Sequence, residues 1–452
     1  MSFAQPVAIQ ANGDTITDTI VSGPYTFNNL TENDSSSGPI YLYAVSKPAR
    51  GRVEIRPGNV VIYTPSTSFR GEDTFQYAIS SSPNGGGSIS SATVTIRNPY
   101  YINRGTYTSA IAGAHQTHED SGYLSLTVDP KGVFTASVRF AGHLFPIKAV
   151  FDAGGHYTAT IVRPAPLSAL SLDIQFPFEG PQEISCVLTN GAETTPFIAP
   201  LNLWSSINPP ALAGRYTLML PIPDLNLTTP KGGGYATMVI GVNGTATFTG
   251  RTGDNRRFTT STKLHVNNKV PLYSPLYSGR GSIFGDVILN RIDTDSVSLD
   301  ASLVWTKLRN TKDRYFRSGF IRTITARGSN YIVPQANTCV LNTSSVTDFN
   351  SNFTLAGGIL RLPRTERALL GNRPDFDLYK LAFDNSKRLQ ASISISAANG
   401  TFFGSFFDVR TRKRYTVSGV FAQGDNVAYG IWSTTAIGGR PGSVMLVPDS
   451  IE

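Results

Sequence analysis

A four-strand pattern that appears three times constrains the fold of this chain most. The copies begin at Ser121, Gly234 and Gln390, and each alternates apolar and polar residues between short turns. When they are aligned on the first turn glycine (Gly132, Gly244 or Gly400), the later turns also match. These fall at 141–143, 253–255 and 409–411, and then at 153–155, 266–268 and 423–425. Such alternation predicts antiparallel β-meanders, so we expect three related β-modules.

Composition supports a chain made almost entirely of β-structure. Charged residues make up 15% of the sequence, against the usual value of about 25%. Glycine is plentiful, at 42 residues, and Tyr and Phe greatly outnumber Trp and Met. These proportions are typical of twisted, turn-rich sheets. The one stretch with a helical pattern is 364–370. We therefore predict an all-β chain in which 452 residues form about three or four domains.

The first hundred residues predict a β-sandwich, because short strands recur about every 8–12 residues. Residues 20–97 resemble the bacterial cadherin-like (tandem-95, Ig-like) repeats of large surface proteins. The segments that carry the resemblance are Asn33-Asp34, Lys47-Pro48, Gly51-Arg52-Val53, Tyr63-Thr64-Pro65, Phe69–Tyr77 and Ala92–Ile96. The resemblance implies an extracellular spacer or adhesion module.

Some relatives of these repeats bind calcium through carboxylates, and the candidates here are Asp34, Glu72 and Asp73. Calcium prefers about 6–8 oxygen ligands, and three carboxylates supply few of them. The last strand also follows Ser-Pro-Asn-Gly instead of the usual Asp-Gly pair. Asp73 as a turn cap beside Gly71 is the structural alternative. No cofactor is assigned, and calcium stays open.

Three modules are expected to follow a short linker at 98–104. The first two open alike, with Gly105-Thr-Tyr-Thr108 and Gly214-Arg-Tyr-Thr217, and each holds about eight strands. That number suits a small antiparallel barrel or a sandwich. We predict a sandwich over 1–98 and modules over 99–205, 206–330 and 331–452. Separators are expected at 199–210 and 326–352.

The modules resemble uncharacterised β-rich regions at the C-terminal end of large cell-surface proteins from some environmental bacteria. The segments that carry this resemblance are Ala213–Thr217, Gly234-Tyr235, Pro271–Tyr277 and Gly404–Phe406. The resemblance implies a location at the cell surface and no particular reaction.

The net charge of +8 and the pI near 9.4 fit nucleic acid, an anionic polysaccharide or an anionic membrane as partner. The basic residues look scattered along the sequence. The dense runs are Arg256-Arg257 and Arg410–Arg414, and both adjoin predicted hairpin turns. We expect solvated hairpin tips there, with an anion-binding patch as the alternative. Nucleic acid is not expected as a partner.

Two cysteines, Cys186 and Cys339, exclude a disulfide framework and a cysteine-based metal site. Whether they are bridged to each other is open. No stretch reaches the ~18 apolar residues of a membrane span. The first 18 residues lack the basic and apolar regions of a signal peptide, so we expect a mature or truncated chain of an extracellular or surface protein.

No arrangement in the sequence names a reaction. The histidines are expected in solvated loops and turns, although 115–120 could bind a metal; they are His115, His118, His143, His156 and His265. No Gly-x-Ser-x-Gly motif occurs. The carboxylate pairs Asp293/Asp295 and Asp375/Asp377 lack a predicted sugar cleft, and Lys231–Gly234 is expected to be a flexible loop. No catalytic, cofactor-binding or metal residue is therefore assigned.

Aromatic residues offer the better candidates for binding. Those expected to be exposed include Tyr100 and Tyr101 in the linker, Tyr273 and Tyr277, and one face of a strand at 402–407. On that strand, Phe402 and Phe406 share one face while Phe403 and Phe407 share the other. We expect one pair in the core and the other against a neighbouring module. The sequence thus predicts a non-catalytic extracellular structural or adhesion protein that self-associates or binds other surface proteins. The alternative is a carbohydrate-binding surface protein.

Overall fold

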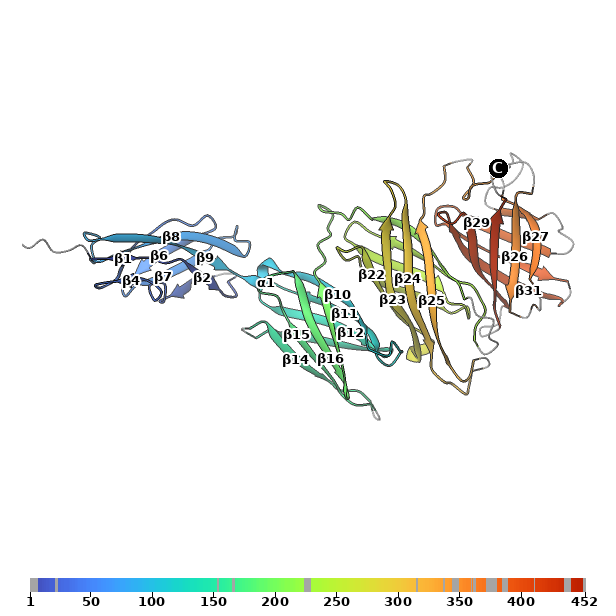
Figure 1. The fold of residues 1–452 in the computed structure, drawn as a ribbon, viewed down its shortest axis with the longest axis horizontal. Coiled ribbons are helices and arrows are strands. Elements are labelled where there is room, and N and C mark those ends of the chain that lie inside the picture. Colours follow the sequence, from blue (N-terminus) through green and yellow to red (C-terminus); the bar gives the residue numbers. More distant parts are fainter. Residues whose placement is uncertain are drawn as a thin grey trace, which may run out of the picture.

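The computed structural model is an extended array of β-modules (Figure 1). It describes residues 7–449 with these gaps: 21–22, 153, 165–166, 223–228, 314–315, 336–337, 344–348, 359, 361–362, 371–379, 384–388, 410 and 435–439. Within the described residues, helical structure is confined to α1 (Pro99–Ile102) and the 3-10 turn η1 (Tyr277–Gly279). The prediction of an all-β chain is confirmed.

The first domain is a β-sandwich, as predicted. Its larger sheet has the order β2-β9-β8-β5, in which β2 and β9 are parallel, and it faces the sheet β3-β7-β6. Alternating side chains such as Tyr63, Phe75 and Tyr77 point inward and are fully buried. The strands are β1 (Ile9–Gln10), β2 (Asp14–Thr17), β3 (Tyr25–Phe27), β4 (Ser35–Ser36), β5 (Tyr41–Val45), β6 (Gly51–Arg56), β7 (Val60–Pro65), β8 (Glu72–Ser80) and β9 (Ile89–Arg97).

Barrel 1, residues 105–201, consists of two four-stranded antiparallel sheets. β10 and β17 close one seam through the bridge between Tyr107 and Leu201, and β13 and β14 are edge strands at the other seam. Its strands are β10 (Gly105–Ala112), β11 (Ser121–Val128), β12 (Val133–Phe140), β13 (His143–Val150), β14 (His156–Ile161), β15 (Leu170–Gln175), β16 (Glu183–Asn190) and β17 (Glu193–Pro200).

Barrel 2, residues 214–330, is one eight-stranded antiparallel sheet in which the first strand pairs with the last. Its strands are β18 (Gly214–Leu220), β19 (Gly234–Ile240), β20 (Thr245–Arg251), β21 (Arg257–Lys263), β22 (Lys269–Pro275), β23 (Gly281–Arg291), β24 (Val297–Lys307) and β25 (Phe320–Asn330).

Barrel 3, residues 351–448, is fully closed. Its strands are β26 (Ser351–Gly357), β27 (Arg364–Leu369), β28 (Lys380–Phe383), β29 (Leu389–Ser396), β30 (Thr401–Asp408), β31 (Lys413–Ala422), β32 (Val427–Thr434) and β33 (Gly442–Pro448).

The turn glycines of the repeat share one geometry but not one place in the barrels. Gly132, Gly244 and Gly400 have φ of 77°, 71° and 66°, where an L side chain would be strained. Gly132 and Gly244 lie between the second and third strands of their barrels, whereas Gly400 lies between the fourth and fifth. The third copy is therefore shifted by two strands. A shift of this size preserves the direction of every hairpin in an up-and-down meander, so the sequence alignment could not detect it.

Four segments differ from their predicted structure. Residues 364–369 form β27 and not a helix, because Thr365 and Arg367 point outward while Ala368 is buried in the barrel. β17 and β25 were not predicted as strands. A four-residue helix, α1, occupies the expected linker; the side chain of Asn98 caps it by accepting from Tyr101 N at 3.0 Å. The exact domain boundaries stay a prediction.

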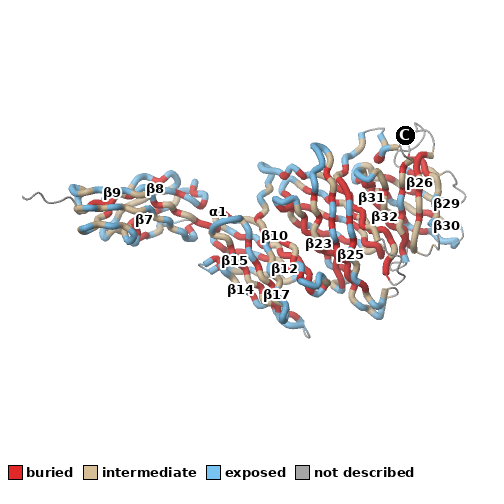
Figure 2. Tube along the Cα trace, in the orientation of Figure 1, coloured by how far each residue is buried: buried red, intermediate tan, exposed pale blue. Residues whose placement is uncertain are grey.

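Buried residues run along the strands of the barrels (Figure 2), and their side chains form a packed core in each barrel. Barrel 2 encloses Trp305, Phe248 and Met238, and barrel 3 encloses Trp432, Phe421 and Phe353, all fully buried. Small barrels of about eight strands have just enough room for such a packed core. Within the described residues, the modules therefore meet their surroundings through outer faces, ends and junctions.

Candidate functional site: the junctions between modules

Tyr100 fastens the first domain to barrel 1. It lies on α1, is only 3% exposed, and inserts between Phe151, Phe176 and Phe178 at the end of the barrel. Its hydroxyl donates to the carbonyl oxygen of Asp152 at 3.1 Å. The prediction that Tyr100 is an exposed linker aromatic was wrong, because the helix turns the ring into the barrel. Tyr101, on the same helix, is half-buried and packs on Phe69 of the first domain.

Asn98 and a turn of barrel 1 complete this junction. Asn98 Nδ2 donates to Ile20 O of the first domain at 2.8 Å and to Pro130 O of barrel 1 at 3.1 Å. The fully buried Asn98 side chain thus bridges the two modules. Buried amides of this kind favour one geometry, since any other leaves polar groups unpaired.

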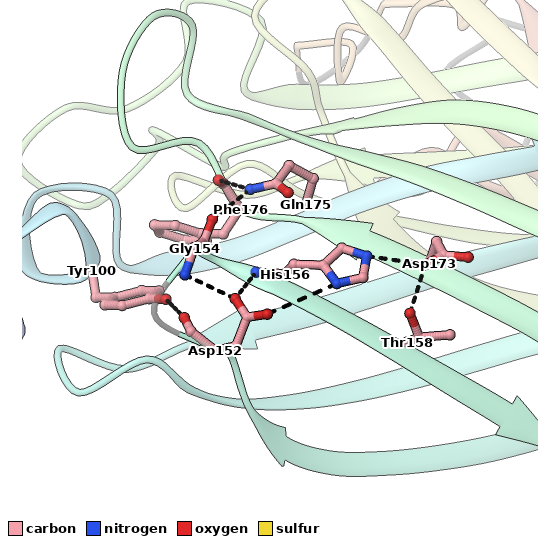
Figure 3. A network of polar contacts seen from close by, with 8 residues as sticks. All are labelled: Tyr100, Asp152, Gly154, His156, Thr158, Asp173, Gln175 and Phe176. Carbon is pink, nitrogen blue, oxygen red and sulfur yellow. Dashed lines mark hydrogen bonds and ion pairs between the residues drawn. The ribbon is translucent and has the colours of Figure 1, made fainter.

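The turn that receives Tyr100 is held by a polar network on the surface of barrel 1 (Figure 3). Asp152 Oδ1 accepts from Gly154 N and His156 N, at 2.9 and 2.8 Å. His156 Nε2 and the Thr158 hydroxyl both contact Asp173 Oδ1, at 3.1 and 2.7 Å. His156 is exposed, as predicted, and its neighbours orient the turn.

The junction between barrels 1 and 2 has an apolar centre formed by Tyr123, Tyr273, Phe284 and Val304. Thr262 Oγ1 donates to the Tyr123 hydroxyl at 2.8 Å, and Gly142 N donates to the Tyr273 hydroxyl at 2.9 Å. Burial raises the pKa of Tyr273 to about 12. The prediction that Tyr273 is exposed was wrong, because barrel 1 covers this face of barrel 2.

Two buried histidines flank that apolar centre. His118 Nε2 lies 3.0 Å from Gly279 O and must donate to it, so Nδ1 of the neutral ring accepts from Ser282 Oγ at 3.0 Å. His265 Nε2 lies 3.1 Å from Thr108 Oγ1. Burial lowers the pKa of His118, and it lowers that of His265 to about 4. The prediction of solvated loop histidines was wrong for these two. His115 and His143 are exposed as predicted.

The serine contact of His118 does not form a nucleophilic pair that substrate could reach. Ser282 is fully buried, and the second ring nitrogen of His118 bonds a backbone carbonyl instead of a carboxylate. The nearby Asp120 caps its own loop, where it accepts from His115 N and Thr117 Oγ1 at 3.0 and 2.9 Å. The residues at 115–120 thus point in different directions. No group of three potential metal ligands occurs among the described residues.

Barrels 2 and 3 lie side by side (Figure 1) and meet through β18 and β19 on one side and β31 and β32 on the other. Thr217 Oγ1 donates to Phe421 O at 2.9 Å, and Gly424 N donates to Ser329 Oγ at 2.9 Å. At the other end, Asn255 Nδ2 donates to Ser433 Oγ at 2.7 Å.

Gly232 and Gly233 lie in this interface. A Cβ atom on Gly233 would clash with the carbonyl oxygen of Gly430 and the ring of Tyr429. The prediction of a flexible loop at Lys231–Gly234 was wrong for its glycines, because barrel 3 packs directly against this backbone.

A buried acid lies beside the same interface, in the β20–β21 turn. Asp254 accepts from Thr252 Oγ1 at 2.6 Å and from the Tyr277 hydroxyl at 2.8 Å, and Trp305 Nε1 donates to that hydroxyl at 3.1 Å. Burial raises the pKa of Asp254. Tyr277 is therefore not the exposed platform that was predicted. Its hydroxyl links the turn to the core of barrel 2.

The carboxylates considered for calcium are each engaged by different partners. Asp73 accepts from Arg50 N and the Tyr63 hydroxyl, both at 2.9 Å, and Glu72 pairs with Arg97 at 3.1 Å. Asp34 instead lies near Asp14, and each has a buried oxygen without a hydrogen-bond partner. Asp14 had not been considered, and its separation from Asp34 by 20 residues hid the pair. Calcium binding stays a prediction.

In the pair Asp293/Asp295, the first carboxylate is engaged in its own turn. Asp293 caps its turn by accepting from Asp295 N and Ser296 N, both at 2.8 Å. Asp375 and Asp377 lie outside the described residues.

The strand at 402–407 has the predicted two faces. Phe402 and Phe406 are buried in barrel 3, whereas Phe403 is 57% exposed. Barrel 3 meets barrel 2 through β31 and β32, not through the face that carries Phe403. Cys186 is buried in barrel 1, where burial raises its pKa to about 12, and Cys339 is half-buried. The two cysteines are not bridged to each other.

Comparison with known proteins bears on the first domain. Residues 4–97 match the family model described as bacterial Ig domain. The first domain is a bacterial Ig domain. This match agrees with its β-sandwich and confirms the resemblance seen in the sequence, whereas the resemblance of the barrels stays a prediction. No curated protein matches the chain.

The Ig domain indicates a surface or structural role, and an Ig-like all-β fold is typical of proteins without catalytic activity. Among the described residues, no helix is long and apolar enough to cross a membrane.

Proposed function

We propose that this chain is a non-catalytic structural or adhesion protein of a bacterial cell surface, and that it holds an Ig domain and three barrels in one fixed, extended array. The observation that carries the proposal is that each junction is buried and combines apolar packing with directed hydrogen bonds. Flexible linkers would leave Tyr100, His118 and Gly233 in water.

The described interior supports this role, because core side chains occupy the barrels that would otherwise hold a small ligand. The two buried histidines and the buried acid serve as junction and turn contacts. Rigid spacing of an adhesive or structural surface requires little more than such junctions and a stable β-scaffold.

The location is tested on intact cells of the source bacterium. An antibody against the purified chain should label unpermeabilised cells, and external protease should remove the signal. Labelling that appears only after permeabilisation would overturn the surface placement. A periplasm-facing or cytosolic marker protein is the control for cell integrity.

Self-assembly into a filament or layer is a second candidate, favoured by the open seam of barrel 1. β13 is an edge strand there, and its outward Leu144 and Val150 are each 56% exposed. Pro146 and Lys148 on the same strand oppose edge pairing. Light scattering across a concentration series decides: large species that disappear in a Leu144→Ser, Val150→Ser variant support assembly, and a monomer at every concentration overturns it.

The carbohydrate-binding alternative loses three of its aromatic platforms, Tyr100, Tyr273 and Tyr277, in the structure. Tyr100 and Tyr273 are buried in junctions, and Tyr277 is bonded to Asp254. Glycan stacking through these rings would require the modules to separate. Of the aromatic residues considered for stacking, Phe403 stays exposed.

A further inference from the structure

Among the described residues, most of the exposed cationic side chains of barrels 2 and 3 gather at one end of the barrel pair. In an up-and-down meander, every second connection lies at the same end. For barrel 2 that end holds the loop before β19, the β20–β21 turn, η1 and the loop between β24 and β25. η1 and the last of these loops project from the lower end of barrel 2 in Figure 1. For barrel 3 it holds the β30–β31 turn and the connection before β33.

Contacts between the barrels place these two ends together. At the end that holds η1 and the β20–β21 turn, Lys231 lies against Gly357, and Asn255 donates a hydrogen bond to Ser433. Ser329 and Gly424 meet at the opposite end. Arg257 and the described residues 412–414, which belong to the two dense basic runs, therefore share one surface, although about 150 residues separate them.

This surface, called the basic end below, carries nine exposed cations among the described residues. They are Arg257, Arg280, Arg309, Lys312 and Arg317 of barrel 2, and Arg412, Lys413, Arg414 and Arg440 of barrel 3. The positive residues are scattered along the sequence, but these nine are brought together by the fold.

Among the described residues, the acids of this end are withdrawn from its surface. Asp254 and Asp408 are buried, Asp313 pairs with the buried Lys307 at 2.6 Å, and Glu366 pairs with Arg364 at 2.9 Å. No ion pair links any of the nine exposed cations to a described carboxylate. At the opposite end, by contrast, Lys269 pairs with Asp286 and Arg327 with Asp425, at 2.7 and 3.5 Å. The charge is thus concentrated and unneutralised on one surface.

Hydrogen bonds hold several of these guanidinium groups in place. Arg280 Nη2 donates to Arg309 O at 2.8 Å, and Arg317 Nε donates to Asp313 O at 2.7 Å. Arg414 Nη1 donates to Ser405 Oγ at 3.1 Å. Each guanidinium keeps further N–H donors that can bind carboxylate or phosphate oxygens. Ordered donors lose less conformational entropy on binding.

We propose that the basic end binds an acidic polysaccharide, a polymer whose repeating carboxylate, phosphate or sulfate groups lie across both barrels. A polymer fits because the cations are spread over several loops on two modules, where many weak contacts act together. The recognition depends on charge and does not use the aromatic platforms expected from the sequence.

Two other polyanions fit this surface less well. The exposed large aromatics of the described residues are Tyr43 and Phe403, and neither lies on the basic end, so bases of single-stranded nucleic acid have no ring to stack on. Membrane binding usually adds Trp, Phe or Leu side chains that insert between lipids. The exposed large apolar residues near this end are Ile321 and Val409.

The test measures binding of the purified full chain to polygalacturonate, with neutral dextran as the reference polymer. We expect the chain to bind polygalacturonate and not dextran. Its affinity for polygalacturonate should fall at least about tenfold when NaCl rises from about 50 to about 300 mM. Anionic phospholipid vesicles and a single-stranded oligonucleotide are measured in parallel. Tighter binding to either of them than to polygalacturonate would overturn the proposal.

Charge-reversal variants locate the site. One variant changes Arg309, Lys312 and Arg317 to Glu, and the second changes Arg412, Lys413 and Arg414 to Glu. A control with the same change in net charge replaces Lys47, Lys131 and Lys148, which are exposed on the other two modules. Each basic-end variant should weaken binding about tenfold, and the control should stay within about twofold.

Equal losses in all three variants would show a non-specific effect of net charge and would overturn the proposed site. Glutamine versions of the two basic-end variants serve if a charge-reversed chain fails to fold. Because the assay uses purified protein, its outcome is independent of the cellular location proposed above.

Discussion

His118 of barrel 1 reaches across the junction to Ser282 of barrel 2, with its Nδ1 atom 3.0 Å from the serine hydroxyl. In the neutral ring Nδ1 accepts the hydroxyl proton, whereas a protonated Nδ1 would have to donate to the serine oxygen and would place a positive charge in a buried site. His265, at the same junction, is buried in a similar way. The junction between barrels 1 and 2 should therefore respond to acid.

The sign follows from the lowered pKa values of His118 and His265. Below pH 6.5, the ordinary pKa of histidine, His118 and His265 bind protons in the separated modules but not in the docked ones. Docking therefore weakens as the pH falls. For His265 the weakening extends from 6.5 to about 4. Among neighbouring charges, Glu119 and Asp286 favour protonation, whereas His143 and Lys269 oppose it.

We expect the midpoint of thermal unfolding to fall between pH 7 and pH 4.5, and the two barrels to separate more readily. A His265→Gln, His118→Gln variant should lose much of this pH dependence. The exposed His143→Gln variant is the matched control and should retain it. An unchanged pH profile in the double variant would contradict this account.

Tyr100→Ala should free the Ig domain from barrel 1. Removing a buried aromatic ring costs about 3–5 kcal/mol, and the ring also closes the end of the barrel. Protease should then cleave the native array within 97–104 far faster than before. Tyr100→Phe is the matched control: it keeps the ring, loses one hydrogen bond and should cost about 1 kcal/mol. Equal cleavage of the two variants would show that the ring does not hold the junction.

Tyr277→Phe removes a donor from the buried Asp254 and the acceptor of Trp305 Nε1. We expect a loss of about 1–3 kcal/mol in the free energy of unfolding. The loss should be larger at pH 8 than at pH 4, because a raised Asp pKa means that the folded state favours the protonated acid and ionised Asp254 needs its donors more. Tyr235→Phe is the control, since its hydroxyl makes no hydrogen bond within the described residues. A loss independent of pH would argue against the link to Asp254.

Gly233→Ala should separate barrel 2 from barrel 3. The new methyl group would overlap Gly430 O and Tyr429, and both belong to the packed β32. We expect a destabilisation of at least about 1–3 kcal/mol and faster hydrogen exchange in β19 and β32. Gly86→Ala is the control, because a Cβ there meets nothing within 4 Å. Similar exchange in both variants would be incompatible with the interface described here.

Asp14→Asn should stabilise the Ig domain at neutral pH. Burial and the charge of Asp34 raise the pKa of Asp14, so the ionised acid is a source of strain that grows as the pH rises above 3.8. The melting temperature should rise at pH 7 in the presence of a chelator and hardly change at pH 3. If added calcium raises the melting temperature of the native chain but not of the variant, Asp14 and Asp34 bind the ion. The repulsion between the two carboxylates is then neutralised in the native protein.

Local patterns in the sequence predicted the fold well where alternation and turn residues agree. Gly132, Gly244 and Gly400 mark turns because only glycine adopts their φ without strain. β17 was missed because Pro196 and its polar neighbours resemble a separator. A proline is tolerated there because β17 is the outermost strand of its sheet.

The junctions could not be predicted from the same patterns. His118, Tyr100 and Gly233 all sit in segments that look like loops or linkers, and their burial depends on a neighbouring module. The basic end was hidden for the same reason: Arg309 and Arg414 belong to different loops, and only the parallel arrangement of barrels 2 and 3 brings them to one surface. Hydrophobic periodicity reports how a strand faces its own sheet and not what covers the outer face.

Small-angle X-ray scattering on the monomeric peak from a size-exclusion column tests the central claim, which is that buried junctions hold the four modules in one arrangement. At pH 7.5 the profile should fit a single extended particle with the arrangement of Figure 1. Tyr100→Ala and Gly233→Ala should each broaden the distribution of intramolecular distances. A native profile that requires an ensemble of module orientations would contradict the account.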